Sequence, residues 1–152
     1  MADVEGGDWT TDQASCRSCP VHPNPATRLA AVRRLPAHLL PIAMTDAETA
    51  VRREVARLIG EEWLAVMAWD ADPGVRLIVA ERLRPEQLTA LAGDSDARVR
   101  AAVARRVVPA ALARLAEDSA EEVYRMARLR LGRAPGGDRG PVAALKDKRL
   151  LM

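Results

Sequence analysis

The sequence contains no phenylalanine, and aromatic residues make up only 3% of it. A compact globule of this length usually relies on several large aromatic side chains in its core. The apolar 49% consists mostly of alanine, leucine and valine. Alanine and leucine, like the abundant arginine and glutamate, favour helices. The composition therefore predicts helices packed closely through small side chains, in a chain of 152 residues that allows one domain.

Further absences narrow the class of protein. No apolar run approaches the roughly 20 residues that span a bilayer. The first residues are acidic and lack the apolar stretch of a secretory signal. A net charge of +2 is too small to argue for nucleic acid or a membrane surface, and two cysteines do not make a disulfide framework. We expect a cytoplasmic protein with no membrane contact.

Catalytic motifs are also missing from the sequence. The two histidines, His22 and His38, belong to no nucleophile or zinc-protease motif. The sequence contains neither a glycine-rich phosphate loop nor a G-x-S-x-G motif. Its carboxylates mostly fall at expected helix caps or helix surfaces. We therefore expect that the protein is not an enzyme and has no catalytic residues.

What the sequence does have is self-similarity at a fixed period, which decides the fold before any other feature. Residues 22–133 divide into four gapless pieces of 24 residues and a shorter fifth piece. The pieces begin at His22, Asp46, Asp70, Asp94 and Asp118. Residues 1–21 are interpreted as a cysteine-containing N-terminal cap, and residues 134–152 as a flexible C-terminal tail.

Apolar residues recur at five positions of this repeat. Positions 6, 10 and 14 lie four apart on one face of a helix, and positions 19 and 22 lie three apart on a shorter second segment. The second segment has about seven residues, a length that suits a 3₁₀ or an α-helix. No stretch alternates with period two, so no sheet is expected. Because one unit cannot bury its apolar face alone, the pattern predicts an all-α solenoid.

The repeat resembles the leucine-rich repeat variant family, which is related to HEAT-like repeats. The resemblance rests on the 24-residue length, the mid-repeat proline and the D-x-D-x-x-V-R opening at residues 70–76 and 94–100. It covers residues 22–133. It implies a right-handed α-solenoid in which α-helices alternate with 3₁₀ helices without a β-sheet, and it implies almost nothing about activity.

Two cysteines stand in the N-terminal segment as Cys16-Arg-Ser-Cys19-Pro. This spacing supplies two thiolates from one turn and is used in zinc and iron–sulfur sites. His22 follows three residues later and Asp12 precedes the pair, so a zinc site is one alternative. The resemblance implies half of a family [4Fe-4S] cluster domain, whose second cysteine pair this chain lacks. The remaining alternatives are a free dithiol left from that domain, a redox disulfide, and a cluster shared between the chains of a homodimer.

Arginine fills position 7 of each complete repeat, as Arg28, Arg52, Arg76 and Arg100. Aspartate fills position 1 of every repeat but the first. A guanidinium can fork between carboxylates of its own and the next repeat. The pattern favours an inter-repeat ladder of ion pairs over its alternative, an anion-binding stripe.

A second arginine column lies at position 13, near the end of each expected first helix. Its members are Arg34, Arg82, Arg106 and Arg130. Cations there offset the helix dipole, and we interpret the column as a solvated face. The alternative is a groove that follows phosphates and binds nucleic acid.

Two tryptophans interrupt the regularity of the second repeat. Trp63 takes a place held by Leu39, Gln87 and Ala111 in the other repeats, and Trp69 ends its repeat. An irregular aromatic on a repetitive surface fits a partner-binding hot spot, and packing in the core or between repeats fits it equally well. We therefore expect a non-catalytic scaffold for a protein partner. An iron–sulfur or metal-linked redox module is the second hypothesis, and a nucleic-acid binder is the third.

Overall fold

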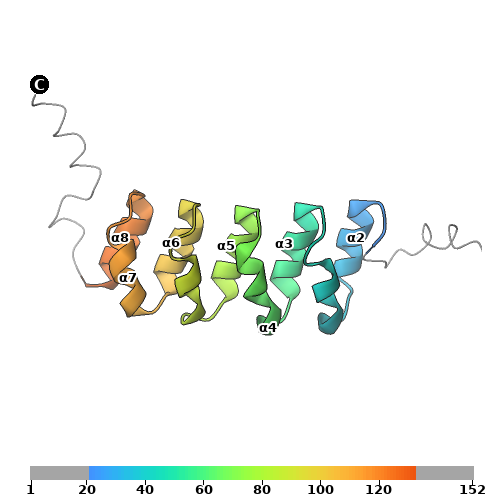
Figure 1. Ribbon diagram of the computed structural model, residues 1–152, viewed down its shortest axis with the longest axis horizontal. Helices are drawn as coiled ribbons and strands as arrows, with labels where there is room; N and C mark the ends of the chain where they lie inside the picture. The colour runs from blue at the N-terminus through green and yellow to red at the C-terminus, as the bar shows by residue number, and fades with distance from the viewer. Residues whose placement is uncertain (1–20, 133–152) are drawn as a thin grey trace, which may run out of the picture. The chain divides into compact units, whose positions relative to one another are not determined.

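The computed structural model describes residues 21–132, and every regular element in that range is a helix (Figure 1). The chain divides into two compact units, Met1–Trp63 and Leu64–Met152, and each is described by itself. The predicted all-α repeat fold is confirmed. The N-terminal cap and the C-terminal tail inferred from the sequence lie outside the described residues, apart from Val21.

The described part of the first unit contains two first helices, α2 and α3, that pack against each other. Its elements are α2 (Pro25–Val32), η1 (Ala37–Ala43), α3 (Thr49–Leu58) and the start of α4 (Glu61–Leu64). The short η1 packs against α3. One repeat therefore consists of a first helix and a shorter second segment, as its apolar spacing predicts.

The second unit continues the same alternation. Its elements are η2 (Val66–Trp69), α5 (Pro73–Arg82), η3 (Gln87–Leu91), α6 (Ala97–Arg106), α7 (Pro109–Leu115) and α8 (Glu121–Arg130). Figure 1 shows α6 between α5 and α8, and it packs against both. The short segments form a second layer, in which η2 packs on α5, η3 on α6, and α7 on α6 and α8.

The starts of the first helices follow from capping chemistry. An Asp72 carboxylate oxygen accepts the backbone N–H of Val75 at 3.0 Å and begins α5. Asp96 begins α6 in the same way by accepting the N–H of Arg98 at 2.8 Å. Such caps satisfy donors that the helix leaves without a partner. Pro73 occupies the first turn of α5, where its missing N–H is not needed.

The five predicted apolar columns form the core. Positions 10 and 19 are buried in every repeat that has them, as Ala31, Val55, Val79, Val103 and Ala127, and as Leu40, Leu64, Leu88 and Leu112. Thr27 and Leu35 in the first repeat are only partly buried. The reason is that the described residues place no helix on the N-terminal side of α2.

The second segments are not all of one kind. η1, η2 and η3 are 3₁₀ helices, whereas α7 is an α-helix of seven residues. Pro109 opens α7 at a position where its fixed φ suits an α-helix. Pro41 lies inside η1 and has no N–H for an α-helical bond. No helix within residues 21–132 is long and apolar enough to cross a membrane.

Candidate functional site

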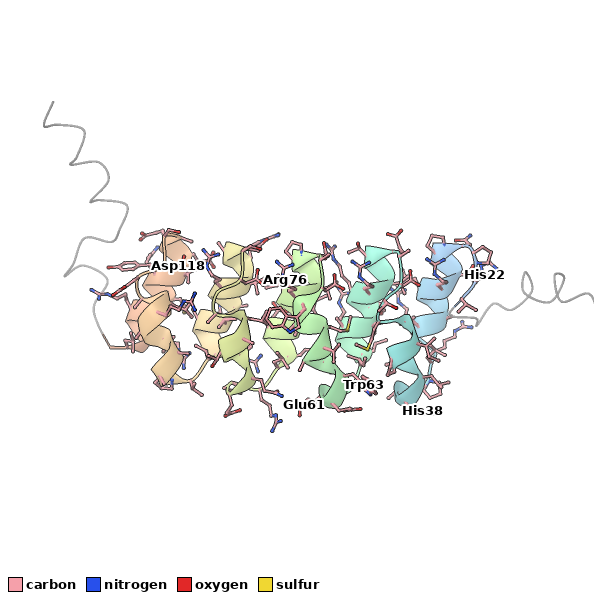
Figure 2. All side chains as sticks on the ribbon, in the orientation of Figure 1. His22, His38, Glu61, Trp63, Arg76 and Asp118 are labelled. Atoms are coloured by element: carbon pink, nitrogen blue, oxygen red, sulfur yellow. The ribbon has the colours of Figure 1, made fainter. Side chains whose placement is uncertain are left out.

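The position 7 arginines bridge successive repeats. In the second unit, Nε and Nη2 of Arg76 donate to the two carboxylate oxygens of Asp94 at 2.7 and 2.9 Å. Nη1 of the same guanidinium donates to the backbone carbonyl of Asp70 at 2.8 Å. Arg100 repeats this geometry with Asp118 at 2.7 and 2.9 Å. Figure 2 shows Arg76 and Asp118 along one edge of the second unit.

The first unit contains the same bridge. Arg28 binds both carboxylate oxygens of Asp46 at 2.7 and 2.8 Å. Arg52 donates to the backbone carbonyl of Asp46 at 2.8 Å. These arginines therefore form the ladder of ion pairs, because their guanidinium groups donate to acceptors of the protein itself.

The ladder changes the acidity of its aspartates. Hydrogen bonds from Arg100 lower the pKa of Asp118 by more than partial burial raises it. Burial alone would raise the pKa of Asp94, but the bonds from Arg76 and from the backbone N–H of Asp96 outweigh it. A carboxylate that accepts charged hydrogen bonds favours its ionised form. Each of these two carboxylates therefore stays ionised to a lower pH than a free aspartate does, and each pair joins two repeats.

Two arginines of the position 13 column correct the interpretation of that column as a solvated face. Nη1 of Arg106 donates to the carbonyl oxygen of Ala80 at 2.9 Å, and Nη1 of Arg130 donates to those of Ala104 and Val107 at 3.0 and 2.8 Å. These carbonyls lie at or just beyond the end of a preceding first helix, where acceptors lack intrahelical partners. The two side chains therefore cap a neighbouring repeat.

The candidate metal ligands are only partly within the described residues. Cys16 and Cys19 lie outside them, whereas His22 lies just before α2. Its Nδ1 accepts the backbone N–H of Asn24 at 3.0 Å. A neutral imidazole that accepts at one nitrogen carries its proton on the other. His22 would have to release Asn24 before it could bind a metal, and residues 21–132 contain no cluster of three possible metal ligands.

The two tryptophans lie at the surface. Trp63, in α4, is 44% exposed, and Figure 2 shows it on the same edge of the first unit as His38, away from His22. Trp69, the last residue of η2, is 79% exposed. Neither belongs to the core, which leaves both indoles accessible to a partner.

A hollow of about 350 Å³ lies beside Trp69 in the second unit. Thr89 and Ala90 of η3, Gly93 of the following turn, and Arg114 of α7 also line it. The ladder residues Arg76 and Asp94 form part of its wall and bind each other there. The hollow thus combines an exposed aromatic ring, small residues and a cation.

Arg114 is the residue of this hollow that the sequence pattern did not single out. Position 21 holds Ile42, Val66 and Ala90 in the other repeats, so Arg114 is the charged member of an otherwise apolar column. That contrast within one column was the available signal. Its guanidinium forms no hydrogen bond or ion pair with any residue in the described range, and it also lines a second hollow.

Comparisons with known proteins agree with the repeat. The family model described as leucine rich repeat variant matches residues 73–96. A solved structure described as a leucine-rich repeat variant with a novel repetitive protein structural motif is 34% identical, with a TM-score of 0.68. That match covers 71% of this chain and 46% of the other, so this chain spans about half the length of its relative. No curated protein matches. With the period, the buried columns and the helix alternation, these matches show that the chain belongs to the leucine-rich repeat variant family.

Proposed function

We propose that the protein is a non-catalytic scaffold that binds a protein partner through its short second segments. The observation that supports this proposal most directly is Trp69, a residue that is 79% exposed beside a surface hollow. Tryptophan is enriched among the residues that dominate binding energy, because a large flat ring buries much area with few rotatable bonds. A partner that covers this ring would remove it from water.

Each unit offers further apolar side chains from its second segments. Ile42 of η1 and Trp63 of α4 are exposed in the first unit, and Val66 of η2 is exposed in the second. Single exposed apolar residues are common, but Ile42 and Val66 share position 21 of the repeat and Trp63 stands at position 18 of the same second segment, which favours an interaction surface. We therefore include Trp63 in the proposed partner-binding surface.

The arginine columns support a protein partner better than a nucleic acid. Arg28, Arg76 and Arg100 each donate hydrogen bonds to an aspartate and to backbone carbonyls. A groove that binds nucleic acid needs several cations free to contact phosphates and release counterions. Ladder arginines would have to break bonds between repeats to do so.

The test compares proteins captured from a cell lysate by the immobilised wild-type chain and by two variants, Trp63→Ala and Trp69→Ala. Leu129→Ala is the matched control, because Leu129 is a large apolar residue with 65% exposure on α8. We expect Trp69→Ala to lose at least one partner that the control retains. Equal recovery of every partner by all variants would contradict the proposal.

We propose a metal-linked role as the second candidate, supported by the Cys16–Cys19 spacing and the nearby His22. These three donors are fewer than the four that a cluster or a structural zinc usually takes. A second chain in a homodimer would supply the remainder of a shared [4Fe-4S] cluster. Such thiols stay reduced in the cytoplasm, which is the compartment we propose.

Anaerobic purification followed by iron, sulfide and zinc analysis tests this second candidate. The expected result is bound metal in wild-type protein, a dimer on the same sample, and loss of both in Cys16→Ser. Metal-free wild-type protein that behaves like Cys16→Ser would remove the hypothesis.

A further inference from the structure

We propose that the hollow between Trp69 and Arg114 binds an acidic segment of the partner protein. In this arrangement an apolar side chain of the segment lies on the Trp69 indole, and a neighbouring Asp or Glu carboxylate binds the Arg114 guanidinium. The inference rests on the proposed scaffold function and adds the chemical class of the ligand.

Of the two arginines and two aspartates that line the hollow, one arginine is available to an anionic ligand. Arg76 and Asp94 are bonded to each other at 2.7 and 2.9 Å. One oxygen of Asp70 accepts the backbone N–H of Asp72 at 2.8 Å. Among the charged residues that line the hollow, Arg114 alone makes no hydrogen bond or ion pair with a described residue. It is therefore the cation on which a ligand carboxylate can form new bonds.

The second hollow leads to the same residue. Its lining includes Arg100 and Asp118, which bind each other at 2.7 Å. Gly93 and Arg114 line both hollows. In each hollow a ladder arginine and a ladder aspartate bind each other, as Arg76 with Asp94 and Arg100 with Asp118. Arg114 lines both hollows and binds neither pair.

Gly93 leaves space for the guanidinium of Arg114. A Cβ atom at residue 93 would lie 3.1 Å from Nη2 of Arg114, which is closer than ordinary van der Waals contact. The corresponding residues of the other repeats are Thr45, Trp69 and Glu117, so the repeat itself does not require glycine there. The glycine allows the guanidinium to lie close to the turn.

A carboxylate suits this site better than a nucleic acid strand. One guanidinium can form two parallel bonds with one carboxylate. A strand binds through several phosphates and needs several free cations. Trp69 and Arg114 line the same hollow. The apolar and acidic residues of the ligand must therefore be close in its sequence, because an extended chain advances about 3.3 Å per residue.

The experiment selects a phage-displayed random peptide library on the full chain. The enriched peptide is synthesised together with a copy in which Asp and Glu become Asn and Gln. Binding of both is measured by isothermal titration against wild type, Trp69→Ala and Arg114→Gln. Arg125→Gln is the charge-matched control, because Arg125 is an exposed arginine on α8 that lines neither hollow.

We expect the selected peptides to combine an acidic residue with an aromatic or aliphatic one. Arg114→Gln should weaken binding about tenfold or more, since a hydrogen bond to a charged group is lost. Arg114→Lys should restore part of the affinity, and added salt should weaken wild-type binding. Gly93→Thr keeps every charge but fills the hollow, so it should also weaken binding while its circular dichroism spectrum stays that of the wild type.

Three results would overturn the assignment. The selected peptides could lack Asp and Glu, or Arg114→Gln could bind them as wild type does. A single-stranded oligonucleotide, or a peptide of residues 1–20 of this chain, could displace them and bind more tightly, which would identify a different occupant. If Trp69→Ala abolishes binding while Arg114→Gln does not, the scaffold proposal is supported and the acidic class of ligand is refuted. If neither variant changes binding, both proposals are refuted.

Discussion

Replacing Asp94 with asparagine tests whether the ladder holds the second unit together. The change keeps the size of the side chain and removes its charge. Asp94 accepts two bonds from Arg76 and one from the backbone N–H of Asp96. In Asp94→Asn an amide N–H₂ replaces an acceptor, so at least one guanidinium donor faces another donor.

The burial of the Arg76–Asp94 pair sets how much stability Asp94→Asn should lose. The side chains of Arg76 and Asp94 are only 12% and 4% exposed. Exposed ion pairs contribute about 0–1 kcal/mol, whereas removal of one partner from a buried pair costs about 3–5 kcal/mol. This pair is close to the buried limit but remains at the protein edge. We therefore expect Asp94→Asn to lower the free energy of unfolding by about 2–3 kcal/mol.

Urea unfolding followed by far-ultraviolet circular dichroism measures this change. The matched control is Arg98→Gln, because Arg98 pairs with Asp96 at 2.8 Å but is 69% exposed and does not bridge repeats. The control should unfold at the wild-type midpoint. The double variant Arg76→Met with Asp94→Asn should be more stable than the sum of the two single changes predicts. An Asp94→Asn midpoint equal to that of Arg98→Gln would refute a structural ladder.

Three further predictions concern the core, the pH dependence and the surface. Leu88→Ala should lower the free energy of unfolding by about 3 kcal/mol, because Leu88 is fully buried; an unchanged urea midpoint would place that column outside the core. Stability should be constant near neutral pH and fall below about pH 4, since Asp118 has a lowered pKa when folded and the unfolded chain takes up the proton first. Urea unfolding of Asp118→Asn should show a weaker fall over that range, and an equal fall would contradict the argument. Trp69→Ala should leave the melting temperature nearly unchanged, because its indole is mostly in water; a large decrease would show that the ring packs within the protein.

The period predicted the fold because one physical requirement acts on every repeat. Residues such as Val79 and Leu88 recur at fixed positions, and each is covered only when a neighbouring copy packs on it. The kind of second segment was less predictable. η1 is a 3₁₀ helix and α7 an α-helix, although each has seven residues. That difference depends on local residues such as Pro109 rather than on the period.

Contacts between repeats were harder to predict than contacts within them. Arg76 could be paired with Asp94 because both recur in register and their chemistry is complementary. The bond from Arg106 to the carbonyl of Ala80 could not, because every residue has a carbonyl and the choice depends on how α5 and α6 pack. Arg114 was missed for a different reason. Arg114 stands out because it has no hydrogen-bond or ion-pair partner among the described residues, and only the three-dimensional structure shows this.

The repeat also determines where binding chemistry can reside. Periodic charges are the ones that successive copies can pair, and Arg28, Arg76 and Arg100 are paired in this way. A residue at a periodic position therefore tends to be engaged by the fold, whatever its chemistry. Specific recognition needs side chains that depart from the period, as Trp69 and Arg114 do. Trp69, Gly93 and Arg114 come from three different repeats and line one hollow. Arg114→Ala, which restores the apolar residue that position 21 has in the other repeats, should spare folding and weaken binding.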